Sequence, residues 1–332
     1  MIKALTAFIV SFVLCVVAMP VIIKFIKKKN ASQTILNYVE NHKDKNGTPT
    51  MGGVVFLIFT PIIAFIFLRY NTEWFMCLLT SLFFGLIGFM DDFIKIKYKQ
   101  NLGLRPYQKV VGQLGLSLIF AVFIYFFTNQ KGNIFLPFSS NLVNIGFWVV
   151  PLIVIVLIST TNSVNLTDGL DGLASGVSFV YLLFFSVISA VVYSQIYQTG
   201  YTGKLLDNLT NIIVINAIFM GLILGFLVFN TSKAKIFMGD VGSLCLGGYI
   251  GTSCCLLGLE FVLPMLGFCF VFSAISVIMQ VIYFKATKKR IFKMAPFHHH
   301  LQMSGLTEPQ IVNIYSTATM LIGGLMLILY LM

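Results

Sequence analysis

The sequence predicts an all-α integral membrane protein with about ten transmembrane helices. Of its 332 residues, 58% are hydrophobic and 10% are charged, whereas soluble globular proteins carry roughly 25% charged residues. The mean hydropathy is +0.93, which excludes a water-soluble enzyme. Two further observations support this fold class. The apolar residues are grouped into stretches of membrane-crossing length, and charge is placed unevenly between these stretches.

The apolar residues fall into ten stretches, each long enough to be a candidate membrane helix. They span roughly 3–26, 52–68, 74–90, 107–127, 147–161, 173–193, 209–229, 242–258, 261–284 and 310–331. Residues 1–332 are therefore expected to form a single polytopic membrane domain.

Charge predicts the orientation of this domain. Helices in series alternate in direction, so five connections share one side: 27–51, 91–106, 162–172, 230–241 and 285–309. With the adjoining helix ends, that side holds all of the 22 Lys and Arg residues except Lys3, Arg69, Lys131 and Lys204. By the positive-inside rule this side is cytoplasmic and both termini lie outside. The longest outside connection, 128–146, is expected to form a small hairpin or a short surface helix.

Most acids and all four histidines also lie on the cytoplasmic side, which orientation alone does not require. Asp91 and Asp92 end the third stretch, with Lys95 shortly after them. Two adjacent carboxylates at a membrane boundary need cations, either lysines or a metal ion. A solvated helix end whose acids face the lysines is an equally good interpretation of this pair alone.

The segment 161–172 is more specific. Asn162, Asn165, Asp168 and Asp171 recur every three residues, and a glycine follows each acid. A helix end that passes into a tight turn could bring these four side chains together. An N-cap and turn would use the same residue types, but polar groups at a membrane boundary favour a functional interpretation.

Two shorter motifs are weaker signals. The sequence KNGTPTMGG at 45–53 offers Lys45, Thr50 and small residues suited to holding a phosphate at a helix N-terminus. Taken alone, however, this motif favours an ordinary Pro-Gly helix start. In FMGD at 237–240, Phe237 could stack a base and Asp240 could bind a metal ion; an ordinary turn is an equal alternative.

The sequence APFHHH at 295–300 follows a basic run, 285–293. Zinc is disfavoured for His298, His299 and His300, because adjacent side chains point in different directions and no Cys or further His is spaced to complete a site. Anion binding or proton handling fits the positive surroundings better. Together, the carboxylates and lysines on one membrane face are the complementary parts of Mg²⁺-assisted phosphoryl transfer, and the setting indicates that one substrate is a lipid phosphate.

The ordered motifs KNGTPTMGG, DDFIK, TNSVNLTDGLDGLA, FMGDVGSL and APFHHH resemble those of the MraY family, the phospho-N-acetylmuramoyl-pentapeptide transferases. This family belongs to the polyprenyl-phosphate N-acetylhexosamine-1-phosphate transferases. The resemblance implies transfer of phospho-MurNAc-pentapeptide from its UDP carrier to undecaprenyl phosphate at the cytoplasmic face of a bacterial cell membrane. The products would be lipid I, for peptidoglycan synthesis, and UMP.

The resemblance also implies a role for each motif residue. Asp240 would bind Mg²⁺ together with Asp168, Asp91 would act as base with support from Asp92, and His298 would join the catalytic residues. The implied substrate-binding residues are Lys45, Thr50, Lys95, Lys109, Asn162, Asn165, Asp168, Asp171, Asn230, Phe237, His299 and His300. Gln302 and Asn313 depart from the residues usual in the family, so no family role is transferred to them.

A related transferase that uses UDP-GlcNAc is the nearest alternative, and an anion transporter is a remote one. Transporters place such polar groups near the bilayer midplane, whereas here they cluster at one boundary. Membrane lipids are expected around the protein. A homodimer is one option for its oligomeric state, because the first and last helices are free to pair. No nucleic-acid partner is expected.

Overall fold

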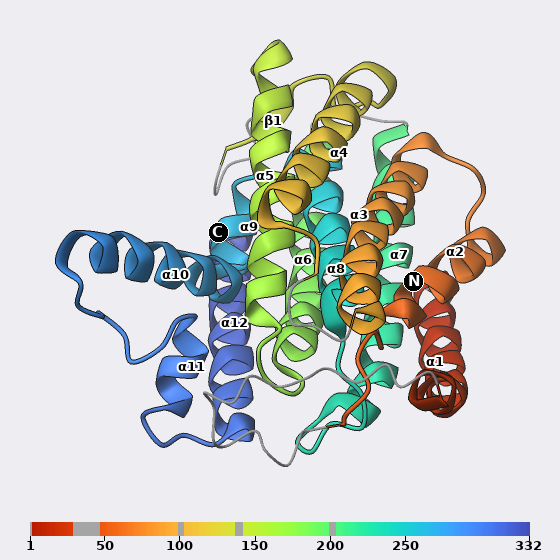
Figure 1. Cartoon of the computed structure of the whole chain (residues 1–332). Coiled ribbons are helices and arrows are strands. Elements are labelled where there is room, and N and C mark those ends of the chain that lie inside the picture. Colours follow the sequence, from red (N-terminus) through yellow and green to blue (C-terminus); the bar gives the residue numbers. More distant parts are fainter. Residues whose placement is uncertain (1, 29–46, 99–102, 137–141, 199–203) are drawn as a thin grey trace.

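The computed structural model describes residues 2–28, 47–98, 103–136, 142–198 and 204–332. The described chain is a bundle of helices with one small hairpin (Figure 1). Its long helices are α1 (Ile2–Lys28), α3 (Thr72–Lys97), α4 (Pro106–Phe127), α5 (Val149–Thr167), α6 (Leu173–Gln198), α7 (Lys204–Asn230), α8 (Gly239–Leu256), α10 (Phe268–Thr287) and α12 (Glu308–Leu331). Shorter helices are α2 (Val54–Phe67), α9 (Val262–Leu266) and α11 (Phe297–Gln302).

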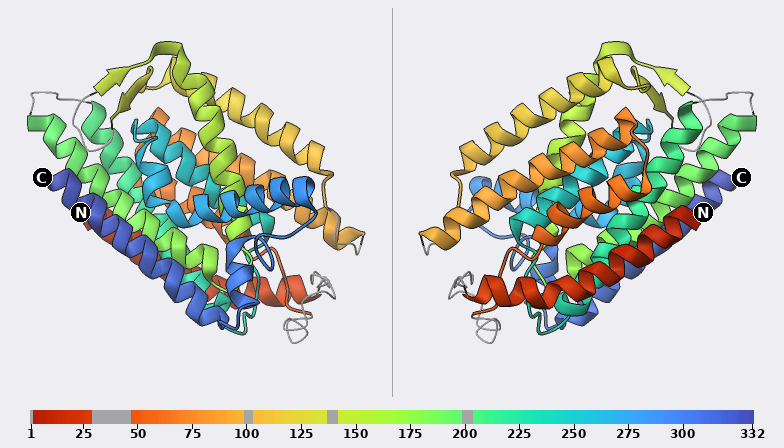
Figure 2. Two further views of the ribbon diagram at one scale, coloured as in Figure 1. Left: turned by 90° about the vertical axis from the view of Figure 1, so that its left-hand side faces the viewer. Right: turned by 90° about the vertical axis from the view of Figure 1, so that its right-hand side faces the viewer.

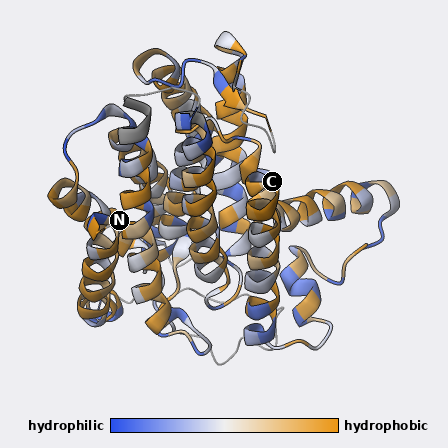
Figure 3. Ribbon diagram, turned by 180° about the vertical axis from the view of Figure 1, so that it is seen from behind, coloured by the Kyte–Doolittle hydropathy of each residue, from blue (hydrophilic) through white to orange (hydrophobic). Residues whose placement is uncertain are grey.

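The bundle has the properties of a multi-pass membrane protein. Eight described segments are long and apolar enough to cross a membrane, and all ten predicted apolar stretches are helical. Large apolar side chains such as Val17, Ile119 and Leu321 remain exposed on the outer surface. Hydrophilic residues gather near the helix ends and in the connections (Figure 3). This distribution fits a protein whose lateral surface contacts lipid instead of water.

Helix α8 lies at the centre of the bundle. All of its residues from Val241 to Leu256 are buried, and it packs mainly against α3 and α5. Its glycines allow this: a Cβ added at Gly242 would lie 2.8 Å from the Cα of Gly53, and one added at Gly247 would lie 2.5 Å from the Cα of Thr161. Small residues thus let neighbouring backbones approach α8 closely. Glycine, serine and threonine also dilute its apolar character, so it is not among the eight segments above.

Three helix boundaries differ from the sequence prediction. Helix α3 continues to Lys97 and α5 to Thr167, so Asp91, Asp92, Asn162 and Asn165 lie on helices and not in connections. The stretch 261–284 is interrupted at Gly267, where the chain changes direction between α9 and α10. Pro264 and Gly267 explain the interruption, since both residues weaken a helix. Helix α10 then projects sideways from the bundle (Figure 1).

The connection 128–146, for which a small hairpin or a short surface helix was expected, contains a hairpin. Strands β1 (Asn133–Phe135) and β2 (Leu142–Asn144) pair antiparallel, with Ile134 opposite Val143, and the short 3₁₀ helix η2 (Gly146–Trp148) follows. The chain termini lie at the same end of the tilted bundle (Figure 2). The start of α8 lies toward the opposite end, where the predicted site residues meet.

Candidate active site

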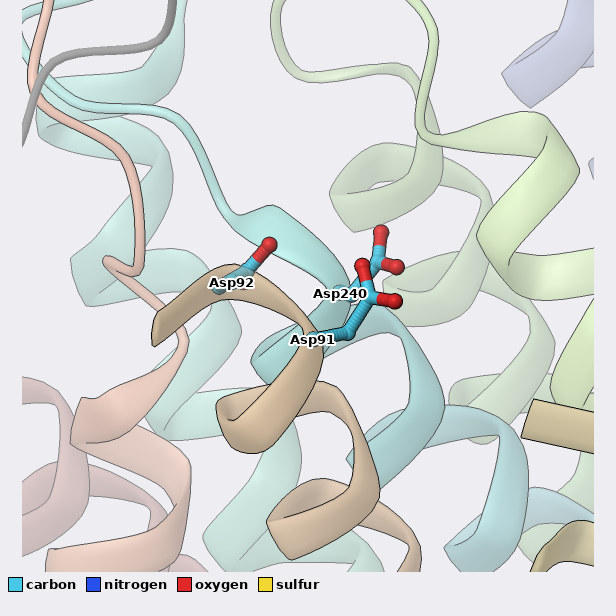
Figure 4. A group of neighbouring side chains, drawn as sticks. All are labelled: Asp91, Asp92 and Asp240. Carbon is cyan, nitrogen blue, oxygen red and sulfur yellow. The ribbon is translucent and has the colours of Figure 1, made fainter. Parts of the chain in front are cut away.

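Three carboxylates form the centre of the candidate site. Asp91 and Asp92 come from the last turns of α3, and Asp240 comes from the first turn of α8 (Figure 4). Each offers a carboxylate oxygen, and these oxygens all lie within 4.8 Å of one another. The close approach depends on Gly88, because a Cβ there would lie 2.2 Å from the backbone oxygen of Asp240.

Two lysines hold these negative charges together. Lys95 Nζ lies 2.6 Å from Asp91 Oδ2, 3.6 Å from Asp92 Oδ1 and 3.4 Å from Asp240 Oδ2. Lys109, near the start of α4, donates to Asp240 Oδ2 at 2.7 Å. Without such cations, three adjacent carboxylates would repel one another strongly.

Backbone and amide donors complete the shell around the carboxylates. The backbone N–H of Leu104 donates to Asp91 at 2.9 Å, and that of Val241 donates to Asp92 at 3.1 Å. Asn165 donates to Asp240 Oδ1 at 2.9 Å and to the Ser243 hydroxyl at 2.9 Å. The position of Asp240 at a helix N-terminus is favourable for a negative charge.

The turn between α5 and α6 brings further acids to the site. Asp168 caps the C-terminus of α5. The pKa of Asp168 is raised well above its usual value, mainly by burial. The negative charges of Asp240, Asp92 and Asp171 raise this pKa further. Asp168 can therefore carry a proton under conditions in which an exposed aspartate would be ionised.

Several predicted binding residues are engaged within the protein. Asp171 accepts from the backbone N–H of Ala234 at 3.0 Å. Asn230 accepts from the Gly172 N–H at 3.0 Å and donates to the Ile236 carbonyl at 2.9 Å. These bonds fix the turn after α5 against the loop between α7 and α8, so both residues shape the site.

The histidine helix α11 packs on the same turn. A Cβ added at Gly169 would lie 2.3 Å from His298 Nε2 and 3.0 Å from His299 Nε2. His298 is fully buried, and neither ring nitrogen has a hydrogen-bond partner in the described part of the chain. Burial, with a smaller contribution from His299, lowers the pKa of His298 to about 3. His298 is therefore neutral at physiological pH.

The other two histidines face different neighbours. His299 Nδ1 lies 3.2 Å from the Gln302 side-chain oxygen. His300 accepts from the backbone N–H of Lys293 at 3.2 Å and packs against Phe292 and Phe297. The rings of His298 and His299 nevertheless lie side by side, with centroids 4.4 Å apart, so the prediction that adjacent histidines point in different directions is wrong for this pair.

The segment after Gly47 lies beside the start of α8. The backbone N–H of Phe237 donates to the Pro49 carbonyl at 2.8 Å, and the Gly52 N–H donates to the Phe237 carbonyl at 2.8 Å. Thr50 is buried, and its hydroxyl would lie 3.0 Å from a Cβ placed on Gly239. Phe237 and Thr50 are thereby close to the carboxylates, whereas Lys45 lies outside the described residues.

The three central carboxylates fit a Mg²⁺ ion by their chemistry. Magnesium prefers oxygen ligands and commonly uses one or two protein carboxylates together with substrate phosphates. Asp91, Asp92 and Asp240 provide such oxygens. Asp168, which the resemblance to the family implied as a second ligand, is not part of this group of three.

Sequence reasoning missed two groups that the structure connects to the site. Gln113 accepts a hydrogen bond from Asn162 at 2.8 Å. Glu308, at the start of α12, accepts from the backbone N–H of Asp171 and from the side chain of Gln302. The signal for Gln113 was its spacing of four residues from Lys109, which places both on one side of α4.

Comparison with known proteins shows the family to which the chain belongs. Residues 74–258, more than half of the chain, match the family model described as glycosyl transferase family 4. The chain is thus a helical membrane protein of this glycosyl transferase class.

The chain belongs, within this class, to the phospho-N-acetylmuramoyl-pentapeptide-transferase family. Residues 45–57 match signature 1 of that family. A phospho-N-acetylmuramoyl-pentapeptide-transferase of Thermoanaerobacter sp. (strain X514) is 39% identical over 320 residues, covering 96% of each chain. Relatives of the same name in Clostridioides difficile (strain 630) and Clostridium novyi (strain NT) are 36% and 40% identical, over 96% of this chain and 95% of each relative.

Proposed function

We propose that the protein transfers phospho-MurNAc-pentapeptide from UDP-MurNAc-pentapeptide to undecaprenyl phosphate, forming lipid I and releasing UMP. The names of the relatives and the match to signature 1 support this substrate pair. The observation that carries the proposal is the group of three carboxylates held by two lysines at the end of a membrane bundle. Both substrates are polyanions, and one is a lipid.

The site would hold Mg²⁺ through Asp240, with Asp91 and Asp92 beside it. The ion would neutralise charge on the pyrophosphate of the nucleotide substrate. Lys95 and Lys109 already contact Asp240, and their ammonium groups can interact with phosphate oxygens in the same small volume. Pairing of these lysines with substrate phosphates would provide the electrostatic stabilisation that dominates phosphoryl transfer.

We assign deprotonation of the acceptor phosphate to Asp91, supported by Asp92. The demand on this base is small, because a phosphate monoester has a second pKa near 6 and is largely dianionic at neutral pH. An oxygen of the lipid phosphate would attack the phosphorus next to the sugar, and the bond from that phosphorus to the bridging oxygen would break, leaving UMP.

The remaining residues would bind the nucleotide and sugar parts. Phe237 is only half-buried at the edge of the site, so its ring can stack on uracil. Thr50 and Asn165 lie next to the carboxylates, and the His298–His300 helix would bound the sugar-phosphate side. Because His298 is neutral, it would act as a hydrogen-bonding group and not as a cation.

The site would face the cytoplasm, where UDP-activated sugars are made, with both termini outside. The support is the concentration of Lys and Arg in the connections at the site end of the bundle. The protein would then be a multi-pass protein of the bacterial cell membrane.

An assay of UMP release tests the proposed function. Purified protein is supplied with polyprenyl phosphate and either UDP-MurNAc-pentapeptide or UDP-GlcNAc, with Mg²⁺ or with excess chelator. We expect UMP only from UDP-MurNAc-pentapeptide and only with Mg²⁺. Turnover of UDP-GlcNAc alone would assign the protein to another branch of the superfamily.

A further inference from the structure

A second layer of polar contacts lies one helical turn below the carboxylates. Lys109 and Gln113 are four residues apart on α4, and Asn162 and Asn165 are three apart on α5, so each pair shares a helix face. In the upper layer, Lys109 reaches Asp240 Oδ2 at 2.7 Å and Asn165 reaches Oδ1 at 2.9 Å. In the lower layer, Asn162 donates to Gln113 Oε1 at 2.8 Å.

The lower contact joins α4 directly to α5. The side-chain nitrogen of Asn162 also donates to the Ile158 carbonyl at 2.8 Å. Both amide hydrogens of Asn162 are thus used inside the protein. This geometry gives Asn162 a different role from Asn165, whose side-chain nitrogen contacts Asp240 itself.

Burial of the Gln113 side chain at its position is unfavourable in free energy. It is 1% exposed on an otherwise apolar part of α4, and its Nε2 has no acceptor among the described residues. A buried amide with an unpaired donor is unfavourable, whereas a leucine of similar size would have no polar atom to satisfy. The hydrogen bond accepted by Gln113 Oε1 therefore needs an explanation beyond packing.

We propose that Gln113 is a positioning residue for Lys109. Its hydrogen bond with Asn162 sets the spacing between α4 and α5, so that Lys109 from one helix and Asn165 from the other engage opposite oxygens of Asp240. Gln113 acts through Lys109 and does not touch the substrate. The inference rests on the proposed function in taking Asp240 as the reaction centre.

The test uses Gln113→Leu with Ser117→Ala as the matched control. Ser117 lies one turn deeper on the same face of α4, is fully buried, and its hydroxyl has no partner among the described residues. Two quantities are measured: kcat/KM for UMP release, and the rate at which an acetylating reagent modifies Lys109 in the substrate-free protein. Mass spectrometry quantifies the modification relative to the exposed Lys3.

We expect Gln113→Leu to lower kcat/KM roughly tenfold, which corresponds to the upper end of the free energy that one hydrogen bond contributes. Lys109 should be acetylated about threefold faster or more, because loss of its ion pair frees the amine. Ser117→Ala should leave both quantities unchanged. Gln113→Asn withdraws the amide by one methylene and should change kcat/KM and the acetylation rate in the same directions as Gln113→Leu. It replaces Gln113→Leu in the test if that variant is poorly folded.

Unchanged acetylation of Lys109 in Gln113→Leu and Gln113→Asn would overturn the inference, even if activity falls, because Gln113 would then not act through Lys109. An equal effect of Ser117→Ala would also overturn it, since any polar loss on this face would suffice. A wild-type protein that releases no UMP would instead contradict the proposed function, while the acetylation rates would still decide the role of Gln113.

Discussion

Asp240 receives donors from three helices: Lys95 of α3, Lys109 of α4 and Asn165 of α5. Lys95 and Asn165 lie in sequence motifs at a membrane boundary, where polar groups favour a functional interpretation. Lys109 lies outside those motifs and was expected only from the resemblance to the family. Gln113 was not predicted. Its spacing of four residues from Lys109 places it on the same side of α4, but it lies outside the sequence motifs and its partner Asn162 is 49 positions away in the sequence.

Glu260 gives a pH-dependent prediction at the other end of the bundle. It lies between α8 and α9, where burial raises its pKa to about 8, partly offset by hydrogen bonds including one from Gln130. The folded protein thus binds a proton more tightly than the unfolded chain, in which the pKa is near 4.5. Stability from this group is fully present below about pH 4.5 and is lost as the pH rises toward 8.

We expect Glu260→Gln to remove this dependence. Thermal unfolding in detergent, measured from pH 5 to pH 8, should show a falling Tm for the wild type and a flatter curve for the variant. The variant should be the more stable of the two at pH 8. A Tm of the wild type that rises with pH over this range, relative to the variant, would refute a neutral Glu260.

At the scale of the elements, the ten apolar stretches predicted the helices well, and the differences have local causes. Helix α3 continues past residue 90, where the apolar stretch ends. Its charged last turns stay helical because Lys95 pairs with Asp91 one turn before it. Hydropathy could not detect the break at Gly267, since the residues on both sides are apolar. The central place of α8 was also hidden, because burial on all sides depends on contacts that its glycines allow.

Helix spacing at Gly88 should control activity. In Gly88→Ala, the new methyl group would lie 2.2 Å from the Asp240 carbonyl oxygen, so α3 must move away from α8 and separate the carboxylates. We expect at least a tenfold loss of UMP release and a destabilisation of about 1–3 kcal/mol, as for other overpacked sites.

Gly115→Ala is the matched control for this change. A Cβ at Gly115 on α4 meets no atom within 4 Å, and alanine is the better helix former. Its activity should equal that of the wild type, and its Tm should be equal or slightly higher. Full activity in Gly88→Ala would show that the spacing between α3 and α8 is not needed for transfer.

At the scale of the whole molecule, the charge distribution predicts which end of the bundle faces the cytoplasm. Ser232 lies in the exposed loop before α8, at the site end, and Lys131 lies beside the hairpin at the opposite end. The six native cysteines are all buried, so an introduced cysteine can be labelled selectively.

We expect a membrane-impermeant maleimide, added to intact spheroplasts, to label Lys131→Cys and to spare Ser232→Cys until the membrane is opened. The reverse pattern would invert the orientation and place the site outside. Labelling of both variants in sealed spheroplasts would mean that the barrier was not intact, which an internal cytosolic marker controls.

The central claim is that the carboxylate group around Asp240 is the reaction centre of phospho-MurNAc-pentapeptide transfer. The most direct measurement compares UMP release by wild type and Asp240→Asn with UDP-MurNAc-pentapeptide, polyprenyl phosphate and Mg²⁺, with Tm as the check on folding. We predict a loss of at least about a hundredfold, because the variant removes a charge on which metal and lysines converge, with Tm retained. A folded Asp240→Asn protein that keeps most of its turnover would contradict the claim.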